Sequence, residues 1–385
     1  MGDSIAATSK RVTDLRLESD LLARFEHDVE SAGLVGERNN AKVILLGSAS
    51  AKLRKPLNVN VGGASASGKN HLIGAVARFI PDEDKKILTG MTPKVLMYAE
   101  EDEYEHKAIF IAEYEGVAGA DYAIRTMQSE QIIEWEFVES SKGGIQKRAK
   151  RVKGPAAFIQ ATTRVTLHPE NETRLLFCQM DESEMQTRAI NKRQALEAER
   201  KVTICPSDLH GNWHELIRSL KTTSVRIPFA NQLSQHLPGN RIRSRRDFPK
   251  LLGLIEAAAF LHQHRRARDV NGDIVAAPAD YITAKALFEH CYYSGPESKV
   301  GELLKVAAGL PGADFSVADL MQKTGWGKSK TYSVLGRAED LSCIGEGYQR
   351  GRYQLLSNHV EAPLNLPPKL ELSAHDFRIS MGVPA

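Results

Sequence analysis

Cysteine and long apolar runs are both scarce in this sequence, and each scarcity excludes a class of protein. The four cysteines among 385 residues are scattered without a close pair, so the sequence predicts neither a disulfide framework nor a zinc ribbon. No apolar run approaches the length that crosses a bilayer, and the first residues lack an apolar signal core. We therefore expect a cytoplasmic protein.

Neither sign of charge dominates the composition. Lys and Arg number 51 against 48 Asp and Glu, a net charge of +3, so any contact with nucleic acid must come from local basic clusters. An apolar fraction of 42% with 26% charged residues is ordinary for a globular protein and excludes a disordered chain. At roughly 100 to 200 residues per domain, the length predicts two to four domains.

The spacing of apolar residues changes along the chain. It is helical before residue 57, alternates between strand-like and helix-like runs up to residue 205, and is helical again up to residue 296. The strand-like runs are residues 57–61, 108–112, 157–161 and 175–179. We predict an N-terminal helical segment (1–56), an α/β core (57–205), a helical lid or linker (206–296), a small C-terminal unit (297–357) and a tail (358–385).

A phosphate-binding loop follows the first predicted strand. Residues 63–70, Gly-Ala-Ser-Ala-Ser-Gly-Lys-Asn, match the pattern G-x-x-x-x-G-K between a strand and a helix. Small residues let backbone amides wrap phosphates, the helix N-terminus adds its dipole, and Lys69 bridges the outer phosphates. The alternative is a glycine-rich turn with a chance lysine. The pattern predicts ATP and Mg²⁺ as cofactors, with contacts from Gly63, Ser67, Gly68, Lys69 and Asn70.

Asn70 departs from this pattern, because a Ser or Thr hydroxyl normally helps to hold Mg²⁺ at its position. An amide carbonyl also ligates Mg²⁺, but it is uncharged and bulkier. The loop therefore predicts nucleotide binding and leaves the efficiency of hydrolysis open.

A P-loop ATPase also needs a carboxylate at the end of a neighbouring strand, to orient Mg²⁺ and polarise the attacking water. Glu113 directly follows the apolar run 108–112 and is predicted to be this residue. Glu115 is the second choice, because strand alternation would point both side chains the same way. The alternative for Glu113 is an exposed acid at a strand end.

Two threonines end the next predicted strand. Thr162 and Thr163 follow residues 157–161, where a polar side chain can hydrogen-bond the attacking water or the terminal phosphate. We predict that one of them senses the nucleotide.

Two arginines are candidates for contacting nucleotide phosphates. Arg174 precedes the strand 175–179, the position of an arginine finger that stabilises transition-state charge in a neighbouring subunit. A salt bridge to Glu170 or Glu172 is its alternative. Arg188 lies on the helix that follows and is a candidate sensor arginine, with a solvated helix arginine as the alternative.

A basic β-hairpin is predicted before the threonine strand. Residues 132–137 alternate in polarity, Gly143-Gly144 supplies a tight turn, and residues 145–153 form the second strand. Its cations predict salt-dependent, sequence-independent contact with DNA phosphates. The alternative is a solvated edge strand, because lysine also protects sheet edges. The candidate DNA contacts are Lys142, Lys147, Arg148, Lys150 and Arg151.

The C-terminal unit has the helix spacing of a helix-turn-helix. A capping box at Ser316 opens its second helix, which stops at Gly325, and a third helix begins at Lys328. A glycine-rich turn before Tyr353 resembles the wing of a winged helix. Protein docking is the alternative to DNA binding. The candidate DNA contacts are Lys328, Lys330, Arg337, Arg350 and Arg352.

The order of these motifs resembles the ATPase portion of primase-helicase proteins from plasmids, integrative elements and phages. The resemblance runs from about Glu18 to beyond His264. It is carried by Gly36-Glu37, Arg54-Lys55-Pro56-Leu57, Gly63 to Lys69, Met91-Thr92-Pro93, Glu113-Tyr114-Glu115-Gly116, Gln128-Ser129-Glu130, and Asp181-Glu182-Ser183 to Thr187-Arg188. It implies an AAA+ P-loop ATPase core with a helical lid, similar to minichromosome-maintenance helicases, and the hairpin inserted before the sensor strand.

The resemblance also implies a function. The chain would be an ATP-dependent DNA helicase or replication motor of a mobile genetic element, assembled as a homo-oligomeric, hexameric ring. DNA and a separate primase or replication protein of the element would be its partners. Tyr114 departs from the family, where an acidic residue is often found. The cysteine pattern and the length of a primase are missing, so primer synthesis is not expected.

Two other functions remain open. An ATP-binding switch, helicase loader or regulator with weak or no hydrolysis is favoured by Asn70. A small-molecule kinase would use the same loop but would need neither the basic hairpin nor the C-terminal unit.

Overall fold

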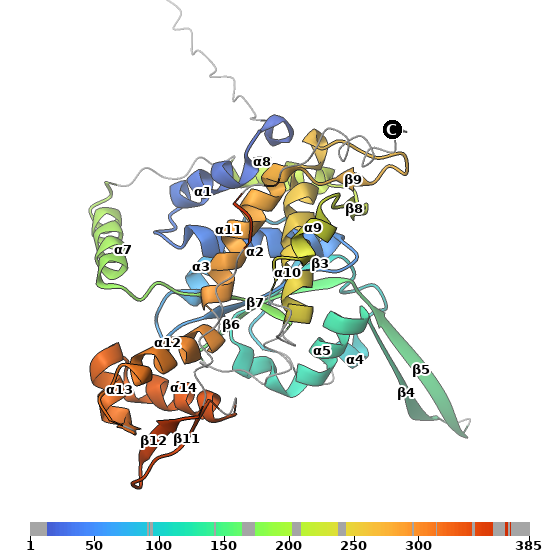
Figure 1. The fold of residues 1–385 in the computed structure, drawn as a ribbon. Coiled ribbons are helices and arrows are strands. Elements are labelled where there is room, and N and C mark those ends of the chain that lie inside the picture. The colour runs from blue at the N-terminus through green and yellow to red at the C-terminus, as the bar shows by residue number, and fades with distance from the viewer. Residues whose placement is uncertain are drawn as a thin grey trace, which may run out of the picture.

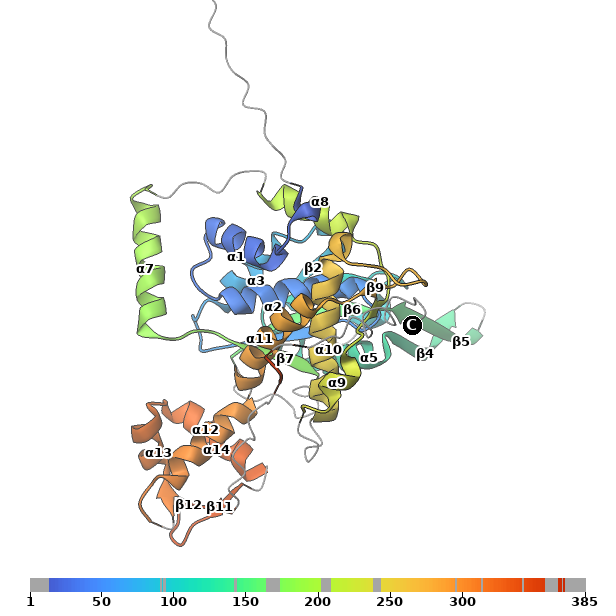
Figure 2. The ribbon, with the colours of Figure 1, turned by 45° about the horizontal axis from the view of Figure 1, so that its top comes forward.

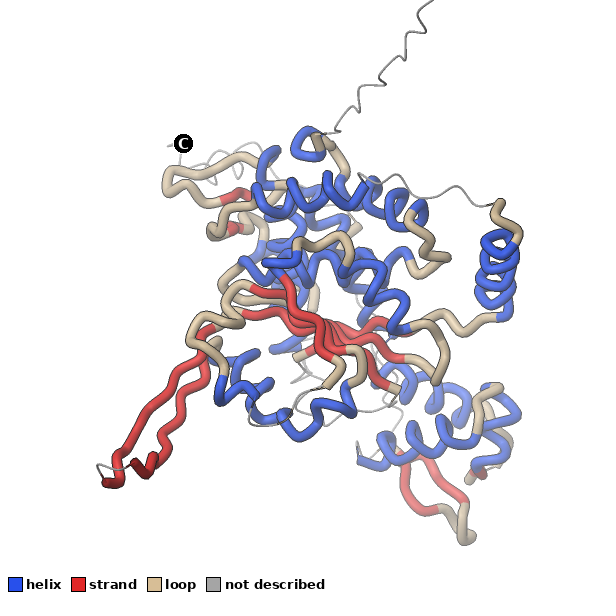
Figure 3. Tube along the Cα trace, turned by 180° about the vertical axis from the view of Figure 1, so that it is seen from behind, coloured by secondary structure: helices blue, strands red, loops and turns tan. Residues whose placement is uncertain are grey.

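A five-stranded parallel sheet lies at the centre of the larger part of the molecule, with helices on both faces (Figure 1, Figure 3). Its spatial order is β2-β3-β6-β1-β7, and each neighbouring pair is parallel. The strands are β1 (Asn58–Gly62), β2 (Lys85–Leu88), β3 (Lys107–Ile111), β6 (Ala156–Thr162) and β7 (Leu175–Gln179). Because all five run the same way, their carboxyl ends share one edge of the sheet, which carries the candidate site.

This computed structural model describes residues 14–90, 92, 95–141, 144–163, 174–201, 209–237, 244–294, 296–312, 314–340, 343–356, 366–368 and 370. Within these ranges, none of the helices has both the length and the apolar character that crossing a membrane requires.

The buried strands divide their side chains between two hydrophobic cores. On β6, Ala157 and Ile159 face the first core and Ala156 and Phe158 face the second, as the period of two in a strand requires. The first core holds α1 (Leu21–Ser31), α2 (Arg38–Ala49), α3 (Lys69–Ala77), α8 (Leu209–Ser219), α10 (Ser244–Leu261) and α11 (Pro278–Ser294). The second holds α4 (Val95–Tyr98), η4 (Tyr114–Ala120) and α5 (Asp121–Glu130). The predicted α/β architecture is therefore confirmed.

The N-terminal segment and the expected lid share this first core. Phe25 of α1 packs edge-on against Trp213 of α8, with ring centroids 5.2 Å apart, and against Phe79 at 5.1 Å. Asp28 of α1 accepts a hydrogen bond from the Trp213 indole at 2.9 Å. His262, just beyond α10, accepts one from the Leu21 amide at 3.1 Å. The contacts of α1 with Trp213 and His262 join segments more than 180 residues apart into one packed layer.

Short elements complete this part of the chain. They are η1 (Leu15–Leu17), η2 (Ser50–Lys52), η3 (Asp82–Asp84), β8 (Val225–Arg226), α9 (Ala230–Ser234), η5 (Gln263–Arg265) and β9 (Ile274–Val275). From the expected tail, Leu366 and Leu370 are buried in the first core, and Pro367 accepts a hydrogen bond from Tyr281 at 2.6 Å. Part of the expected tail therefore belongs to the main core.

The predicted hairpin is present as β4 (Ile132–Ser141) and β5 (Gly144–Lys153). The two strands pair antiparallel along their whole length, from Ile132 opposite Lys153 to Ser141 opposite Gly144. They pair with each other and with none of the other described strands, so the hairpin projects from the body (Figure 1, Figure 3). In the chain it is inserted between β3 and β6.

Helix α7 (Glu184–Ala198) stands beside the body (Figure 1, Figure 2). Gln186 is its one buried described side chain, and its amide donates to the Val35 carbonyl at 2.7 Å. A helix that is polar on all sides either spans solvent between two parts of a protein or is stabilised by many i,i+4 side-chain pairs. Two such pairs, Arg188 with Glu184 and Arg193 with Glu197, are present here.

The C-terminal unit has its own hydrophobic core. Its elements are α12 (Pro296–Ala308), β10 (Phe315–Ser316), α13 (Val317–Thr324), α14 (Lys328–Asp340), β11 (Ile344–Glu346) and β12 (Arg352–Leu355), with the antiparallel sheet order β10-β12-β11. The predicted capping box is present, because Ser316 and Asp319 bond each other's backbone amides. Helix α13 ends at Gly325, whose φ of 70° suits glycine.

Candidate functional site

The glycine-rich loop connects the end of β1 to the start of α3, as the sequence predicted. Gly68, with φ of 93°, begins the helix, and no side chain caps the first turn of α3. Gly63 has no room for a side chain, because a Cβ there would lie 2.6 Å from Ser67 Oγ. The loop therefore stays narrow, and the amides of the first helical turn are not held by a side-chain cap, which is the arrangement that binds an anion.

Lys69 lies inside the loop, with only 9% of its surface exposed. Its ammonium donates to the carbonyl oxygens of Gly63 at 2.8 Å and Ala64 at 2.6 Å. These carbonyls hold one positive charge at the mouth of the loop, where the outer phosphates of a nucleotide would carry negative charge. Asn70 is the next residue on α3 and is exposed.

A carboxylate that is distant in the sequence contacts this loop. Glu182 Oε1 accepts a hydrogen bond from the Ala64 amide at 2.6 Å, across 118 residues. Met180, two residues before it, would lie 3.0 Å from a Cβ on Gly63, so the end of β7 packs directly on the loop. Glu182 was not predicted as a site residue, although Asp181-Glu182-Ser183 is among the motifs behind the resemblance, because no local pattern identifies so distant a contact.

Thr162 and Thr163 lie beside the loop. Thr162 is buried and pairs in register with Gly62, the last residue of β1, while Thr163 is exposed at the edge of the sheet. Both threonines therefore lie at the same end of the sheet as the loop.

Glu113 lies farther from the loop than expected. It follows β3 and is exposed, but β6 separates β3 from β1, so Glu113 is two strands away rather than one. Two strand spacings correspond to about 10 Å. The end of β6, with Thr162 and Thr163, stands between Glu113 and the loop.

The argument for Glu115 from strand alternation was wrong. Strand β3 ends at Ile111, and η4 begins at Tyr114, so the alternation stops before either glutamate. Tyr114, which replaces the acidic residue frequent in the resembling family, is 5% exposed and donates to the Asp121 carboxylate. It serves the packing of η4 on α5.

Arg174 lies on the opposite edge of the sheet from the loop. It immediately precedes β7, whose first residue pairs with Asn58 and whose last pairs with Gly62. Five strand residues place it about 17 Å from the loop edge. Its Nε donates to Ser129 Oγ at 3.0 Å. The possible partners Glu170 and Glu172 lie outside the described residues.

Arg188 is not brought to the loop. Its side chain is 78% exposed on α7 and pairs with Glu184 at 2.5 Å within the same helix. This geometry is that of a solvated i,i+4 pair.

A polar groove of about 340 Å³ lies beside the end of β7. Glu37 accepts from the Asp181 amide at 2.8 Å, and His290 bonds Asn40 at 2.7 Å. Burial raises the pKa of Glu37 and lowers that of His290. The groove is lined by Glu26, Gly36, Glu37, Arg38, Asn39, Asn40, Gln179, Asp181 and His290. Sequence reasoning did not assign these residues to a site, although Gly36-Glu37 belongs to the motifs behind the resemblance.

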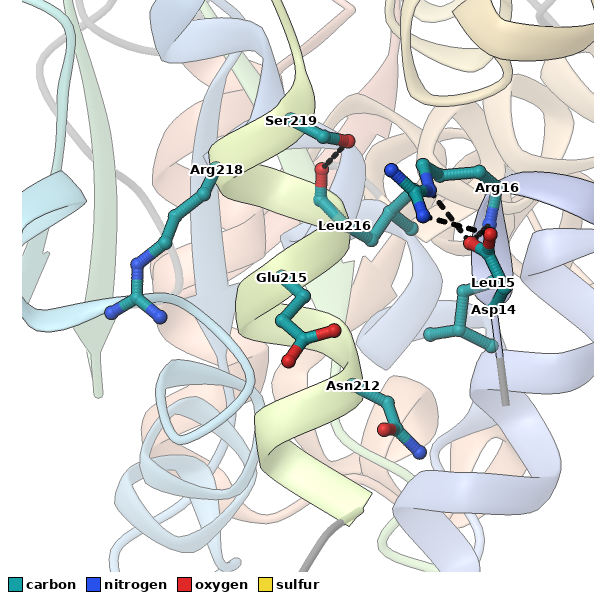
Figure 4. A pocket seen from close by; sticks show the side chains of 8 residues that line it. All are labelled: Asp14, Leu15, Arg16, Asn212, Glu215, Leu216, Arg218 and Ser219. Atoms are coloured by element: carbon teal, nitrogen blue, oxygen red, sulfur yellow. Dashed lines mark hydrogen bonds and ion pairs between the residues drawn. The ribbon is translucent and has the colours of Figure 1, made fainter. Parts of the chain in front are cut away.

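A larger groove of about 420 Å³ lies elsewhere, between η1 and α8 (Figure 4). Asp14 and Arg16 form an ion pair at 2.7 Å along one wall, and Glu215 and Arg218 lie on the other. None of the predicted site residues lines it. The smaller groove is the one that adjoins the loop, because Asp181 in its lining directly follows Met180, which packs on Gly63.

The cations of the hairpin are partly neutralised by carboxylates. Lys147 pairs with Glu136 at 2.6 Å and Arg151 with Glu134 at 3.2 Å, both across the two strands. Lys150 instead donates to the backbone carbonyl of Tyr98 at 2.8 Å. Arg148 is exposed, and Lys142 lies outside the described residues.

Two predicted DNA contacts of the C-terminal unit point inward. The Arg352 guanidinium binds the Asp314 carboxylate at 2.7 Å, so its charge is used inside the unit. The Lys330 ammonium lies over the Trp326 ring, 5.1 Å from its centroid, and burial followed by the Lys299 charge lowers its pKa, while Glu182 acts in the opposite direction. Lys328 and Arg350 are exposed, and the Arg337 side chain is outside the described set.

Among the described residues, no group of three or more His, Cys, Asp or Glu side chains is arranged to hold a metal ion by itself. Mg²⁺ would have to arrive with nucleotide phosphates, as in P-loop sites generally. Lys69 and the uncapped amides fit the phosphates that would carry such an ion.

A strand, a narrow glycine loop with a buried lysine, and a helix at the carboxyl edge of a parallel sheet define a P-loop nucleotide-binding domain. Residues 17–210 match the MTBMA_p00010 P-loop domain, and the chain belongs to this family. The match covers about half of the chain and contains the loop, Glu113, both threonines and Arg174. No curated protein matches the sequence.

Proposed function

We propose that this protein is an ATP-driven DNA motor of the AAA+ class, acting as a helicase in the replication of a mobile genetic element. The observation that carries the proposal is the order β2-β3-β6-β1-β7. It aligns the P-loop, Thr162 and Glu113 along one edge, with the basic hairpin inserted between the acidic and threonine strands.

The nucleotide is proposed to lie along the loop and the neighbouring groove. The amides of residues 63–70 hold the phosphates, and Lys69 bridges the outer two. Asn70 and Glu113 hold Mg²⁺ through the nucleotide. The nucleoside lies in the groove at Glu37 and Asn40. This groove adjoins the loop, because Met180 packs on Gly63 and the next residue, Asp181, lines the groove.

Hydrolysis is proposed to use the three polar groups at the sheet edge. Glu113 polarises water for attack on the terminal phosphate, because it is an exposed carboxylate at the same edge of the sheet as the loop. Thr163 is exposed to hydrogen-bond either group, and Thr162 fixes the end of β6 against β1.

Arg174 is proposed to act on the nucleotide of a second copy of this chain. About 17 Å of strand separates it from its own loop, so it cannot reach the phosphates there. A repeated head-to-tail contact between subunits closes into a ring, and a hexamer is the assembly we propose.

The hairpin and the C-terminal unit are the proposed DNA-binding parts. Lys147, Arg148, Lys150 and Arg151 supply positive charge on the projecting hairpin. The C-terminal unit, with three helices and a three-stranded sheet, is proposed to be a winged helix that contacts DNA through Lys328 and Arg350. Lys330 and Arg352 are left out of this surface because Trp326 and Asp314 engage them.

One observation favours a second function, an ATP-binding switch with weak hydrolysis. Asn70 replaces the hydroxyl that normally helps to hold Mg²⁺ at its position. A weaker hold on Mg²⁺ would slow turnover more than it would prevent nucleotide binding.

The test is ATP hydrolysis by the full chain with and without single-stranded DNA, together with ATP binding. A motor should show DNA-stimulated hydrolysis that Lys69→Ala and Glu113→Gln both abolish, with binding retained in Glu113→Gln. Glu115→Gln is the matched control and should keep most of the activity. ATP binding without turnover in the natural chain would contradict the motor and support the switch.

A mixing experiment tests the role of Arg174. Lys69→Ala has a defective loop and an intact Arg174, whereas Arg174→Ala has the reverse. If the arginine acts across subunits, each variant is inactive alone and a mixture regains part of the activity. Full activity of Arg174→Ala, or no recovery on mixing, would overturn the assignment.

A further inference from the structure

The two faces of the hairpin carry different side chains. Residues directly opposite each other in an antiparallel pair point to the same face, and successive residues point to opposite faces. Trp135 lies opposite Lys150, and Phe137 opposite Arg148. We call this side the aromatic face, and its members are Ile133, Trp135, Phe137, Arg148, Lys150 and Val152.

The other side, called here the paired face, carries no aromatic ring on its described side chains. Its two acids, Glu134 and Glu136, are 65% and 62% exposed and bind Arg151 and Lys147. Val138 is an apolar residue of this face and is 66% exposed. Most of the charge on this face is used between its own strands.

The aromatic face changes from buried to exposed along the hairpin. Ile133 and Val152 pack into the second core at its base, and Trp135 is partly buried against that core. Phe137, two residues farther out, is 40% exposed. The two rings therefore form a step that starts on the body and continues into solvent.

Positive charge accompanies both rings. Lys150 donates to the carbonyl of Tyr98, a neutral acceptor, so the lysine keeps its charge beside Trp135 while fixing the hairpin to α4. The ring of Tyr98 is itself 72% exposed. Arg148 lies opposite Phe137 and is exposed. Aromatic rings beside cations are the combination that binds single-stranded nucleic acid through bases and phosphates together.

The spacing of the rings selects the form of the nucleic acid. Residues two apart in a strand lie about 7 Å apart. Bases in duplex DNA are stacked at about 3.4 Å and leave no gap for a side chain. A single strand can separate its bases and place one against each ring.

We propose that the aromatic face of the hairpin binds single-stranded DNA, with bases stacked on Trp135 and Phe137 and phosphates near Lys150 and Arg148. This inference rests on the proposed DNA motor and adds the strandedness of its substrate and the face that holds it. The paired face contributes electrostatic attraction but no base contact.

The experiment titrates the full chain with an unlabelled thymidine oligomer and with a duplex of equal length. Tryptophan fluorescence is the readout, because stacking with a base quenches the indole. Trp213 and Trp326 are 0% and 8% exposed, but Trp326 belongs to the proposed DNA-binding C-terminal unit, so the quenching that is lost in Trp135→Phe is the part that reports on Trp135. We expect quenching by the single strand and a weaker response to the duplex.

Phe137→Ala and Val138→Ala form the matched pair of variants, since both remove an exposed apolar side chain from adjacent residues on opposite faces. Affinity for the single strand should fall about tenfold in Phe137→Ala, the loss of one stacked base, and less than twofold in Val138→Ala. Trp135→Phe keeps a ring and should retain the affinity, measured by anisotropy of a labelled oligomer, while losing the quenching.

The outcomes separate this inference from the function beneath it. If the natural chain binds DNA and shows DNA-stimulated hydrolysis, but both variants weaken binding equally or duplex and single strand bind equally well, the stacking face is wrong and the motor stands. If the natural chain binds no DNA, the proposed motor fails and the inference fails with it.

Discussion

Strands of two kinds carry the candidate site residues of this protein. All seven residues of β6 are buried between two cores, and the site side chains stand at the ends of such strands. On β4, by contrast, Glu134, Glu136 and Val138 are exposed, and its described strand pairing is with β5 alone. Buried strands fix the positions of a few groups, whereas an exposed hairpin presents many side chains with little dependence on packing. Substitutions of the same type should therefore act differently in the two regions.

Replacing phenylalanine tests this difference most strongly. Phe158→Ala should lower the free energy of unfolding by about 3–5 kcal/mol, because the ring is fully buried and leaves a cavity. Phe137→Ala on the hairpin should lower it by about 0.5 kcal/mol, as for other surface positions. Urea denaturation measures both. Equal losses would show that the hairpin is packed as tightly as the sheet.

Breaking a buried ion pair should have the next largest effect. Arg266 binds Asp280 in the first core, with side chains 12% and 1% exposed. Asp280→Asn leaves the arginine charge buried without its partner and should lower stability by about 3 kcal/mol. Glu136→Gln on the hairpin is the control, and its midpoint in urea should stay close to that of the natural chain.

The stability contribution of a buried glutamate should depend on pH, whereas that of an exposed hairpin glutamate should not. Burial raises the pKa of Glu256 on α10 to about 7, while the Lys55 charge partly opposes this shift. Since the folded pKa lies above the unfolded value, the carboxylate costs stability as pH rises from about 4.5 to 7, and the full cost remains above pH 7. Glu256→Gln should therefore stabilise by about 2 kcal/mol at pH 8 and have little effect at pH 4.5.

Denaturation midpoints from pH 4.5 to 8 check this sign. Glu134→Gln on the exposed hairpin is the control, because it removes no buried charge. A gain in Glu256→Gln that is as large at pH 4.5 as at pH 8 would show that packing, not ionisation, is responsible.

The smallest effect on stability is expected at the exposed ion pair of Lys147 with Glu136. Its side chains are 67% and 62% exposed, and exposed pairs contribute little. The urea midpoint of Lys147→Ala should equal that of the natural chain within measurement error. The affinity of this variant for DNA should depend less on salt. A clear loss of stability would mean that the charged pair, rather than backbone pairing, holds the hairpin.

Much of the fold followed from local patterns in the sequence. The apolar runs at 108–112, 157–161 and 175–179 became β3, β6 and β7, and the glycine-rich loop lies between a strand and a helix as its pattern requires. Such strands can be recognised locally, because a strand that is buried on both faces has a continuous apolar sequence. Strand β2 was missed, since its sequence Lys-Lys-Ile-Leu belongs to an edge strand that is only partly buried.

The remainder depended on contacts that no local pattern contains. The position of β6 between β1 and β3 is a matter of strand order, which sets how far Glu113 lies from the loop. Lys330 was a candidate DNA contact on the third helix, but its ammonium lies over the ring of Trp326, four residues earlier. The DNA, ring and helicase assignments stay predictions, since they concern partners rather than this chain alone.

Glu182 has a consequence for how nucleotide affinity should be understood. A backbone N–H donates to one good acceptor at a time, and the Ala64 amide already donates to this carboxylate at 2.6 Å. An incoming phosphate that uses this amide must exchange one anion for another. The apparent affinity is then that of the loop alone multiplied by the fraction of molecules in which the carboxylate has released the amide.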